Sequence, residues 1–371
     1  MSAAVITRAA MAAAVDEIVA GAQHVSINEE RLQSLAQSVQ DYFRHRPVSD
    51  LDGNAVNPAE APVVNDRDTL QYFLMRRAQS FVIWRWTGQT QPAVEAFDCQ
   101  VNGVLYTGER AVNACIMRAV NEGVPLLDPS YLSSMTMADV EHVYRDERGG
   151  PPTYQLLDRR LAKFREVGQV LSDRYDGHMA NLLEAADGQL FRSDGNGSIQ
   201  ALVREFPQCY GDYPFAKLAV TLMTALYNRR DLDIPTTNEY MRLTRIDDPE
   251  NLFGPTDYYI PMFLMRWGVF DLSDEFNAHL AERTLIDQDS DIEREFRACT
   301  LHVFDRVREL AGVSMAELDI EFWYQGAFRC RPCSPADPDP VPCPHRSGCL
   351  AWNQDRRRMD LGWPLVYTPF Y

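Results

Sequence analysis

Two segments of the chain place carboxylates among aromatic side chains. The first reads Thr-Asp-Tyr-Tyr-Ile-Pro over residues 256–261, and the second reads Asp-Ile-Glu-Phe-Trp over residues 319–323. Aromatic rings suit contact with the faces of a flat heterocycle. A carboxylate held against an oxocarbenium-like sugar is the central device of glycosidic bond cleavage. The two segments therefore favour an enzyme that cleaves an N-glycosidic bond.

Asp257 is the candidate catalytic residue of this pair of segments. Its expected role is to stabilise the oxocarbenium-like sugar and to position or deprotonate the attacking water. The same residue could instead cap the helix that the apolar run 260–267 predicts. Asp319 is the candidate acceptor for hydrogen bonds from the amidine-like edge of a base. Asp319 could also cap or solvate the start of a helix, so the residues alone leave both alternatives open.

Three aromatic residues beside these acids could contact the base. Tyr258 is adjacent to Asp257 and is the better candidate for stacking. Trp323 and Tyr324 follow Asp319 closely, but large aromatic residues are more often part of a core than of a stacking platform. We therefore expect Tyr258 to be the principal stacking residue.

A nucleotide 5′-phosphate would require cations, and two basic residues are candidates. Lys217 and Arg297 both stand among apolar residues in the sequence, where an unpaired charge would cost free energy. Arg297 has an alternative partner in Glu293, four positions earlier on the same helix face. The sequence therefore offers two candidate phosphate ligands, one of which has a structural explanation as well.

Cysteines in the proline-rich tail have the spacing of zinc ligands. Cys330 and Cys333 form a Cys-x-x-Cys pair, and Cys343, His345 and Cys349 follow within twenty residues. Four ligands would be the first three cysteines with either Cys349 or His345, and the zinc would be structural. A disulfide pair, or free thiols in a loop, are the alternatives.

Helices must position most of these residues. Residues 27–45 and 292–311 each place apolar side chains along one helical stripe. Ser314 and Glu317 have the spacing of a capping box, which predicts the start of a helix that carries the second acidic segment. The sequence thus predicts helices around both candidate acids.

A small antiparallel β-element is expected between about residues 80 and 106, because aromatic and β-branched residues flank an Asn-Gly turn at 102–103. The predicted fold is predominantly α-helical, with this β-element in the N-terminal third. We expect three parts: N-terminal helices and a loop over residues 1–68, a glycosylase-like catalytic domain over 69–328, and a Cys- and Pro-rich extension over 329–371.

Composition limits the partners. Among 371 residues, 53 acidic and 36 basic side chains give a formal net charge of −17, which disfavours binding to duplex nucleic acid. The sequence contains no apolar run of membrane-spanning length, and residues 1–22 lack the pattern of a signal peptide. Four cysteines scattered through apolar stretches predict free thiols in a reducing cytoplasm. We expect a cytoplasmic monomer that acts on a small nucleotide.

Several segments together resemble the queuosine salvage protein family, the queuosine 5′-phosphate N-glycosylases. They occur in the order of the family, with similar gaps, over roughly residues 70 to 326. The segments are Tyr106-Thr107-Gly108, Asn113-Ala114-Cys115, Arg118-Ala119, Glu122-Gly123-Val124-Pro125, Pro129-Ser130-Tyr131, Met135-Thr136, Phe206-Pro207, Asp257-Tyr258-Tyr259-Ile260-Pro261, Glu293 to Cys299, and Leu318-Asp319 with Trp323.

The resemblance implies a helical fold similar to that of helix-hairpin-helix DNA glycosylases. It also implies hydrolysis of a 7-deazaguanine nucleotide to free base and ribose 5-phosphate, without a metal or organic cofactor in catalysis. The catalytic aspartate of the family, in its Phe-Ala-Asp-Tyr motif, matches Asp257. The base-contacting aspartate of the family, which precedes a Trp, matches Asp319.

Two departures from the family pattern bear on the substrate. The motif reads Phe-Gly-Pro-Thr-Asp here, so that the stacking Phe is either Phe253, with an insertion, or has been lost. Tyr324 stands where the family has a second acid after the Trp. Alternatives are therefore a diverged relative acting on another purine or deazapurine nucleotide, and a binding protein without turnover. A DNA base glycosylase is disfavoured by the acidic charge.

Overall fold

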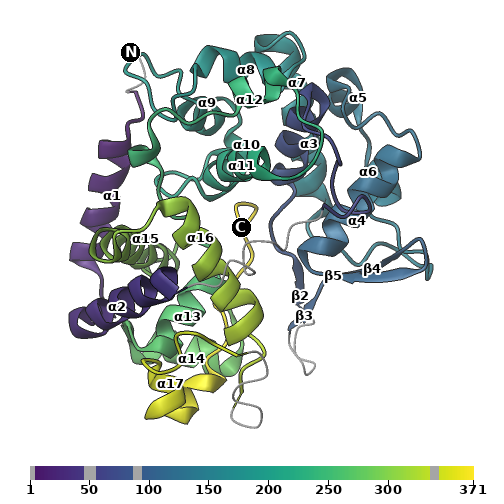
Figure 1. Cartoon of the computed structure of the whole chain (residues 1–371). Coiled ribbons are helices and arrows are strands. Elements are labelled where there is room, and N and C mark those ends of the chain that lie inside the picture. The colour runs from purple at the N-terminus through teal and green to yellow at the C-terminus, as the bar shows by residue number, and fades with distance from the viewer. Residues whose placement is uncertain (1–4, 46–55, 87–93, 335–341) are drawn as a thin grey trace. The chain divides into compact units, whose positions relative to one another are not determined.

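The computed structural model describes residues 5–45, 56–86, 94–334 and 342–371. Contacts divide the chain into two compact units (Figure 1). Unit 1 contains residues 1–7, 54–251 and 368–371, and unit 2 contains residues 8–53 and 252–367. The boundaries expected from the sequence, after residues 68 and 328, stay predictions.

Unit 1 is a helical assembly that also carries the β-element. Its helices are α3 (Arg67–Ala78), α4 (Glu109–Asn121), α5 (Pro129–Ser134), α6 (Met137–Val143), α7 (Leu157–Arg174), α8 (Met179–Ala186), α9 (Ser198–Glu205), α10 (Pro207–Tyr210), α11 (Lys217–Asn228) and α12 (Asn238–Leu243), with the short 3₁₀ turns η2 (Arg229–Asp231) and η3 (Pro249–Asn251). Its strands are β2 (Trp84–Trp86), β3 (Val94–Ala96), β4 (Asp98–Val101) and β5 (Val104–Thr107).

The β-element is confirmed as two antiparallel pairs. Strand β2 pairs with β3, and β4 pairs with β5. Asn102 and Gly103 connect β4 to β5 with φ angles of 50° and 75°, the two positive values that a tight hairpin turn requires. The Asn-Gly signal therefore located this turn correctly.

Unit 2 is also mainly helical. Its helices are α1 (Arg8–Gly21), α2 (Glu29–His45), α13 (Tyr259–Trp267), α14 (Asp274–Glu282), α15 (Asp291–Ala311), α16 (Met315–Tyr324) and α17 (Leu350–Asn353). A π-helical turn, η4 (Gln325–Cys330), continues α16, and a 3₁₀ turn, η5 (Arg356–Asp360), follows α17. Its strands are β1 (Val25–Ile27), β6 (Phe270–Leu272), β7 (Leu285–Ile286) and β8 (Leu365–Val366).

The long helix α15 is the centre of unit 2, and α1 and α2 pack on it (Figure 1). Its buried stripe includes Phe296, Val303 and Phe304, as the periodicity of residues 292–311 predicted. Strand β1 pairs antiparallel with β6, which joins the N-terminal helices to the later part of the unit. The predominantly helical fold is therefore confirmed in both units, whereas the likeness to helix-hairpin-helix glycosylases stays a prediction.

The C-terminal tail has only short regular elements and is attached to the helices before it. Strand β8 pairs in parallel with β7, and the Arg266 guanidinium of α13 donates to the backbone oxygen of Leu361 at 2.9 Å. None of the helices in the described segments combines the length and the apolar character that a membrane crossing needs.

Candidate functional site

Asp257 lies at the start of helix α13 and is almost fully buried. Its Oδ1 accepts hydrogen bonds from the backbone N–H groups of Tyr259 at 2.8 Å and Ile260 at 3.2 Å. The carboxylate therefore caps the first N–H groups of α13 from the position before the N-cap, which Tyr258 occupies. The alternative that made Asp257 the N-cap residue is thus wrong by one position. The two N–H donors and the positive end of the helix dipole stabilise its negative charge and fix its orientation. A fixed anionic carboxylate is also what stabilisation of an oxocarbenium-like sugar requires.

The segment before Asp257 is packed closely against helix α15. A Cβ on Gly254 would come within 2.3 Å of the Phe304 ring, so only glycine fits at this position. Phe253 is buried, and the Arg8 guanidinium lies 4.9 Å from the centre of its ring. The residues between Phe253 and Asp257 thus form a segment fixed by its packing.

Arg297 connects α15 to this segment. Its guanidinium donates to Thr256 Oγ1 at 3.3 Å and to Glu293 Oε1 at 3.2 Å. The Arg297 and Glu293 side chains are both nearly inaccessible to solvent. The ion pair that the i, i+4 spacing predicted is present, and the contact with Thr256 positions the residue that precedes Asp257.

Helix α16 carries the second candidate acid. Ser314 and Glu317 form the predicted capping box, with the Glu317 carboxylate accepting from the Ser314 hydroxyl at 2.6 Å. Asp319 is half-buried within the helix, so the alternative in which it caps the helix start is wrong. Its place on a regular helix gives its carboxylate a rigid attachment.

Trp323 and Tyr324 end α16 at the edge of an aromatic group rather than in the core. The Trp323 ring lies 5.2 Å from Phe328, edge to face, and the Tyr324 ring lies 5.1 Å from Phe328. Tyr324 is 39% exposed, and the Arg329 guanidinium lies 4.7 Å from its ring centre. A role in the apolar core is therefore excluded for Tyr324.

Aromatic contacts hold the helices of this region together. Phe322 of α16 lies 5.4 Å from Phe263 of α13 and 5.0 Å from Phe304 of α15, measured between ring centres. Tyr258 is buried and lies edge to face with Tyr259, with ring centres 4.6 Å apart. The structure thus brings Asp257, Tyr258, Phe253, Arg297 and the helix of Asp319 into one packed group in unit 2.

Lys217 belongs to unit 1, where it begins helix α11 and is half-buried. Lys217 is part of a charged cluster with Glu109. The sequence had suggested instead that it stands among apolar residues. Arg76 and Arg77 bind Glu109 Oε1 at 2.6 and 3.1 Å. Burial alone would raise the pKa of Glu109, but the charges of Arg76, Arg77 and Lys217 lower it to about 2.

Sequence reasoning missed Arg76, Arg77 and Glu109 as members of this cluster. The available signal was the pair of adjacent arginines in the last turn of α3, together with an acid at the start of α4. Arg76, Arg77 and Lys217 thus act together on the single carboxylate of Glu109.

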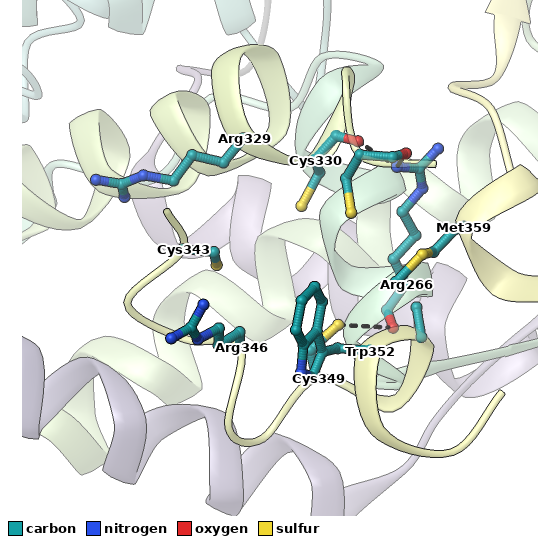
Figure 2. A pocket seen from close by; sticks show the side chains of 10 residues that line it. Arg266, Arg329, Cys330, Cys343, Arg346, Cys349, Trp352 and Met359 are labelled. Atoms are coloured by element: carbon teal, nitrogen blue, oxygen red, sulfur yellow. Dashed lines mark hydrogen bonds between the residues drawn. The ribbon is translucent and has the colours of Figure 1, made fainter. Parts of the chain in front are cut away.

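Four cysteines of the tail surround a small cavity in unit 2 (Figure 2). Cys330, Cys333, Cys343 and Cys349 line it, and its volume is about 30 Å³. Such a space holds a single ion or water and is far smaller than a nucleotide pocket. All eight cysteines of the chain lie in described segments, and none of them is joined to another in a disulfide.

His345 is separate from these cysteines. It is completely buried, its Nδ1 lies 2.8 Å from Ser38 Oγ, and its Nε2 lies 3.0 Å from Glu321 Oε1. Both ring nitrogens are therefore occupied by hydrogen bonds between α2 and α16. Across the described segments, no three His, Cys, Asp or Glu side chains form a ready-made metal-binding group.

Comparison with known proteins shows the family of the chain. The family model described as queuosine salvage protein matches residues 60–321. A queuosine 5′-phosphate N-glycosylase/hydrolase of Sphaerobacter thermophilus is 28% identical over 300 residues, which cover 78% of this chain and 82% of the relative. A protein of the same name from Schizosaccharomyces pombe is 23% identical over 309 residues, which cover 76% of this chain and 83% of the relative. The mouse protein of that name is 21% identical over 247 residues, which cover 66% of this chain and 68% of the relative.

The matched residues include both candidate acids and Lys217, and they end before the cysteines of the tail. Because the family model covers well over half of the chain, this chain belongs to the queuosine salvage protein family.

Proposed function

We propose that this chain hydrolyses the N-glycosidic bond of a 7-deazaguanine nucleoside 5′-monophosphate of the queuosine type. The products are the free base, queuine, and ribose 5-phosphate. The class of enzyme, an N-glycosyl hydrolase, follows from the family and from the shared name of the relatives. The substrate and the residue roles below are our proposal.

One observation carries the proposed mechanism: the buried Asp257 carboxylate is held by two backbone N–H groups directly beside Tyr258. As the bond between C1′ and the base nitrogen breaks, its electron pair leaves with the base and positive charge grows on the sugar. Asp257 stabilises that charge and orients a water molecule. The water oxygen bonds to C1′, one of its protons is released, and the departing base nitrogen gains a proton.

The other candidate residues recognise the nucleotide in this proposal. Asp319 accepts hydrogen bonds from the base, and Tyr258 contacts its ring face. Phe253, Trp323 and Tyr324 are further candidates for contacts with the base.

The 5′-phosphate has candidate ligands among basic side chains of the chain. Lys217 is the first candidate phosphate ligand, and its charge is one of three positive charges that act on Glu109. Arg297, which is paired with Glu293, acts on Asp257 through Thr256 and is the second phosphate candidate. The reaction as written uses water and side chains of the chain, so it needs no organic cofactor.

A second candidate function is hydrolysis of another purine or deazapurine nucleotide. It is favoured by Tyr324, which stands exposed beside Arg329 where the family pattern has an acid. A binding protein without turnover is the non-enzymatic alternative.

A substrate panel separates these functions. Purified chain is incubated with queuosine 5′-monophosphate, queuosine and guanosine 5′-monophosphate, and the released base is identified by mass spectrometry. We expect base release from queuosine 5′-monophosphate at the highest kcat/KM. Release only from a different nucleotide would favour the second candidate, and binding of all three without release would contradict an enzyme.

A further inference from the structure

The four cysteines of the tail come from three separate places in the sequence and meet at one cavity (Figure 2). Cys330 ends η4, and Cys333 follows in the next turn. Cys343 precedes His345 in the tail, and Cys349 immediately precedes α17. Their gathering is a property of the fold, because only the first pair is close in sequence.

Two of the thiols have weak hydrogen bonds that a metal would replace. Cys343 Sγ donates to Gln325 Oε1 at 3.3 Å, and Cys349 Sγ donates to the backbone oxygen of Arg266 at 3.5 Å. A thiol is a weak hydrogen-bond donor, so these bonds hold the sulfur atoms only loosely.

Positive charge surrounds the same cavity. Arg266, Arg329 and Arg346 line it together with the cysteines. Arg266 is buried, and its guanidinium donates to the backbone oxygens of Cys330 and Cys333, the latter at 2.9 Å. A guanidinium fixed behind two cysteines would offset the negative charge of a thiolate cluster.

We propose that Cys330, Cys333, Cys343 and Cys349 bind one zinc ion in a structural, tetrahedral site. On binding, each thiol loses its proton and forms one S–Zn bond, so that Zn²⁺ and four thiols give a zinc tetrathiolate of net charge −2 and four protons. His345 is not a ligand, because Ser38 and Glu321 occupy both of its ring nitrogens. The four thiols line the cavity without forming a ready-made metal-binding group, and zinc binding itself would bring their sulfur atoms together.

The proposed site would fasten the tail to the catalytic helices. Cys330 ends the turn that continues α16, and Arg266 lies near the end of α13. The metal would therefore hold the turn that follows the helix of Asp319. Through the hydrogen bonds of Arg266 it would also hold the C-terminal end of α13, the helix that Asp257 precedes. The ligands lie outside the residues matched by the family model.

Metal analysis of the full chain tests the proposal. The protein is purified without chelator, dialysed, and analysed by elemental mass spectrometry. We expect about one zinc ion per chain in wild type and loss of nearly all of it in Cys343→Ala and Cys349→Ala. Cys299→Ala removes the same sulfur atom from a buried position outside the cavity and should keep its zinc.

A second measurement, on the wild-type chain, tests the zinc site if either variant fails to fold. Stepwise addition of an organomercurial thiol reagent, with a zinc indicator present, should release about one zinc ion as about four thiols react. Absence of zinc from the wild type, zinc retained in both cavity variants, or a disulfide between any two of the four cysteines would overturn the proposal. None of these readouts depends on glycosylase activity, so a failure of the zinc proposal can be distinguished from a failure of the proposed function.

Discussion

Gly326 lies directly against the backbone of Tyr259, the first residue of helix α13. A Cβ on Gly326 would come within 2.4 Å of the Tyr259 carbonyl oxygen. This contact sets how closely the π-helical turn η4 approaches α13 just after the Asp257 cap. It therefore couples the helix of Asp319 to the carboxylate proposed to act on the sugar.

Replacement of Gly326 by alanine should damage both stability and activity. The added methyl group must push against backbone atoms, and such overpacking typically costs about 1–3 kcal/mol. Urea unfolding and kcat/KM would be measured in parallel. Gly21→Ala is the matched control, because a Cβ at Gly21 meets no atom within 4 Å. Equal behaviour of the two variants would contradict a tight contact between η4 and α13.

Glu321 should be important for stability because it bridges α16 to the tail. Its Oε1 accepts from Gln325, lies 3.0 Å from His345 Nε2, and lies 3.3 Å from the Arg329 guanidinium. Glu321→Gln leaves buried donors with a weaker acceptor, and we expect a loss of about 1–3 kcal/mol in the free energy of unfolding. Chemical denaturation at neutral pH measures it, with the exposed Glu309→Gln as control. A loss no larger than that of the control would contradict the bridge.

The stability of unit 1 should fall at low pH through Glu109. The folded-state pKa of Glu109 is about 2, below its usual value of 4.5. Its contribution is therefore fully present above about pH 4.5, and it is lost as the pH falls from there through about 2. Glu109→Gln should lose about 1–3 kcal/mol at pH 7 and differ less from wild type as the pH falls. Unfolding curves between pH 7 and pH 3 check this, and a deficit that grows on acidification would contradict it.

Lys217 should affect recognition of the phosphate and not the chemistry. Lys217→Gln removes one charge from the cluster of Arg76, Arg77 and Glu109, so KM for the 5′-monophosphate should rise about tenfold with kcat little changed. Hydrolysis of the nucleoside without phosphate should be unaffected. Arg357→Gln, at a 91% exposed side chain, is the control. Equal losses for nucleotide and nucleoside would argue against a phosphate ligand.

Local signals in the sequence predicted much of the fold. The capping box at Ser314, the stripe along α15 and the hairpin at Asn102-Gly103 depend on residues a few positions apart, which short-range spacing can reveal. The roles of the two candidate acids stay predictions, although the helix expected after Asp257 is present as α13.

Contacts between distant residues could not be predicted in this way. Gly326 and Tyr259 are far apart in the sequence, and no local pattern encodes their approach. His345 has zinc-ligand spacing, but its partners Ser38 and Glu321 come from other helices. Lys217 has apolar neighbours in sequence, whereas Glu109, on which its charge acts, belongs to the distant helix α4.

The cap at Asp257 allows its structural and chemical roles to be separated. The side-chain oxygen of asparagine can accept the same two backbone hydrogen bonds, so Asp257→Asn should unfold at nearly the same denaturant concentration as wild type. Asp257→Ala removes the acceptor for Tyr259 and Ile260 and should cost about 0.5–2 kcal/mol. An Asn variant as unstable as the Ala variant would contradict this description of the cap.

The most direct test of the central claim is hydrolysis of queuosine 5′-monophosphate by wild type and Asp257→Asn, with folding of both verified by unfolding curves. Asp233→Asn, at an exposed residue, serves as the control. We predict base release by wild type and by the control, and a rate at least about 100-fold lower for the folded Asp257→Asn protein. Release at the wild-type rate by that variant would contradict the role of Asp257 in the reaction.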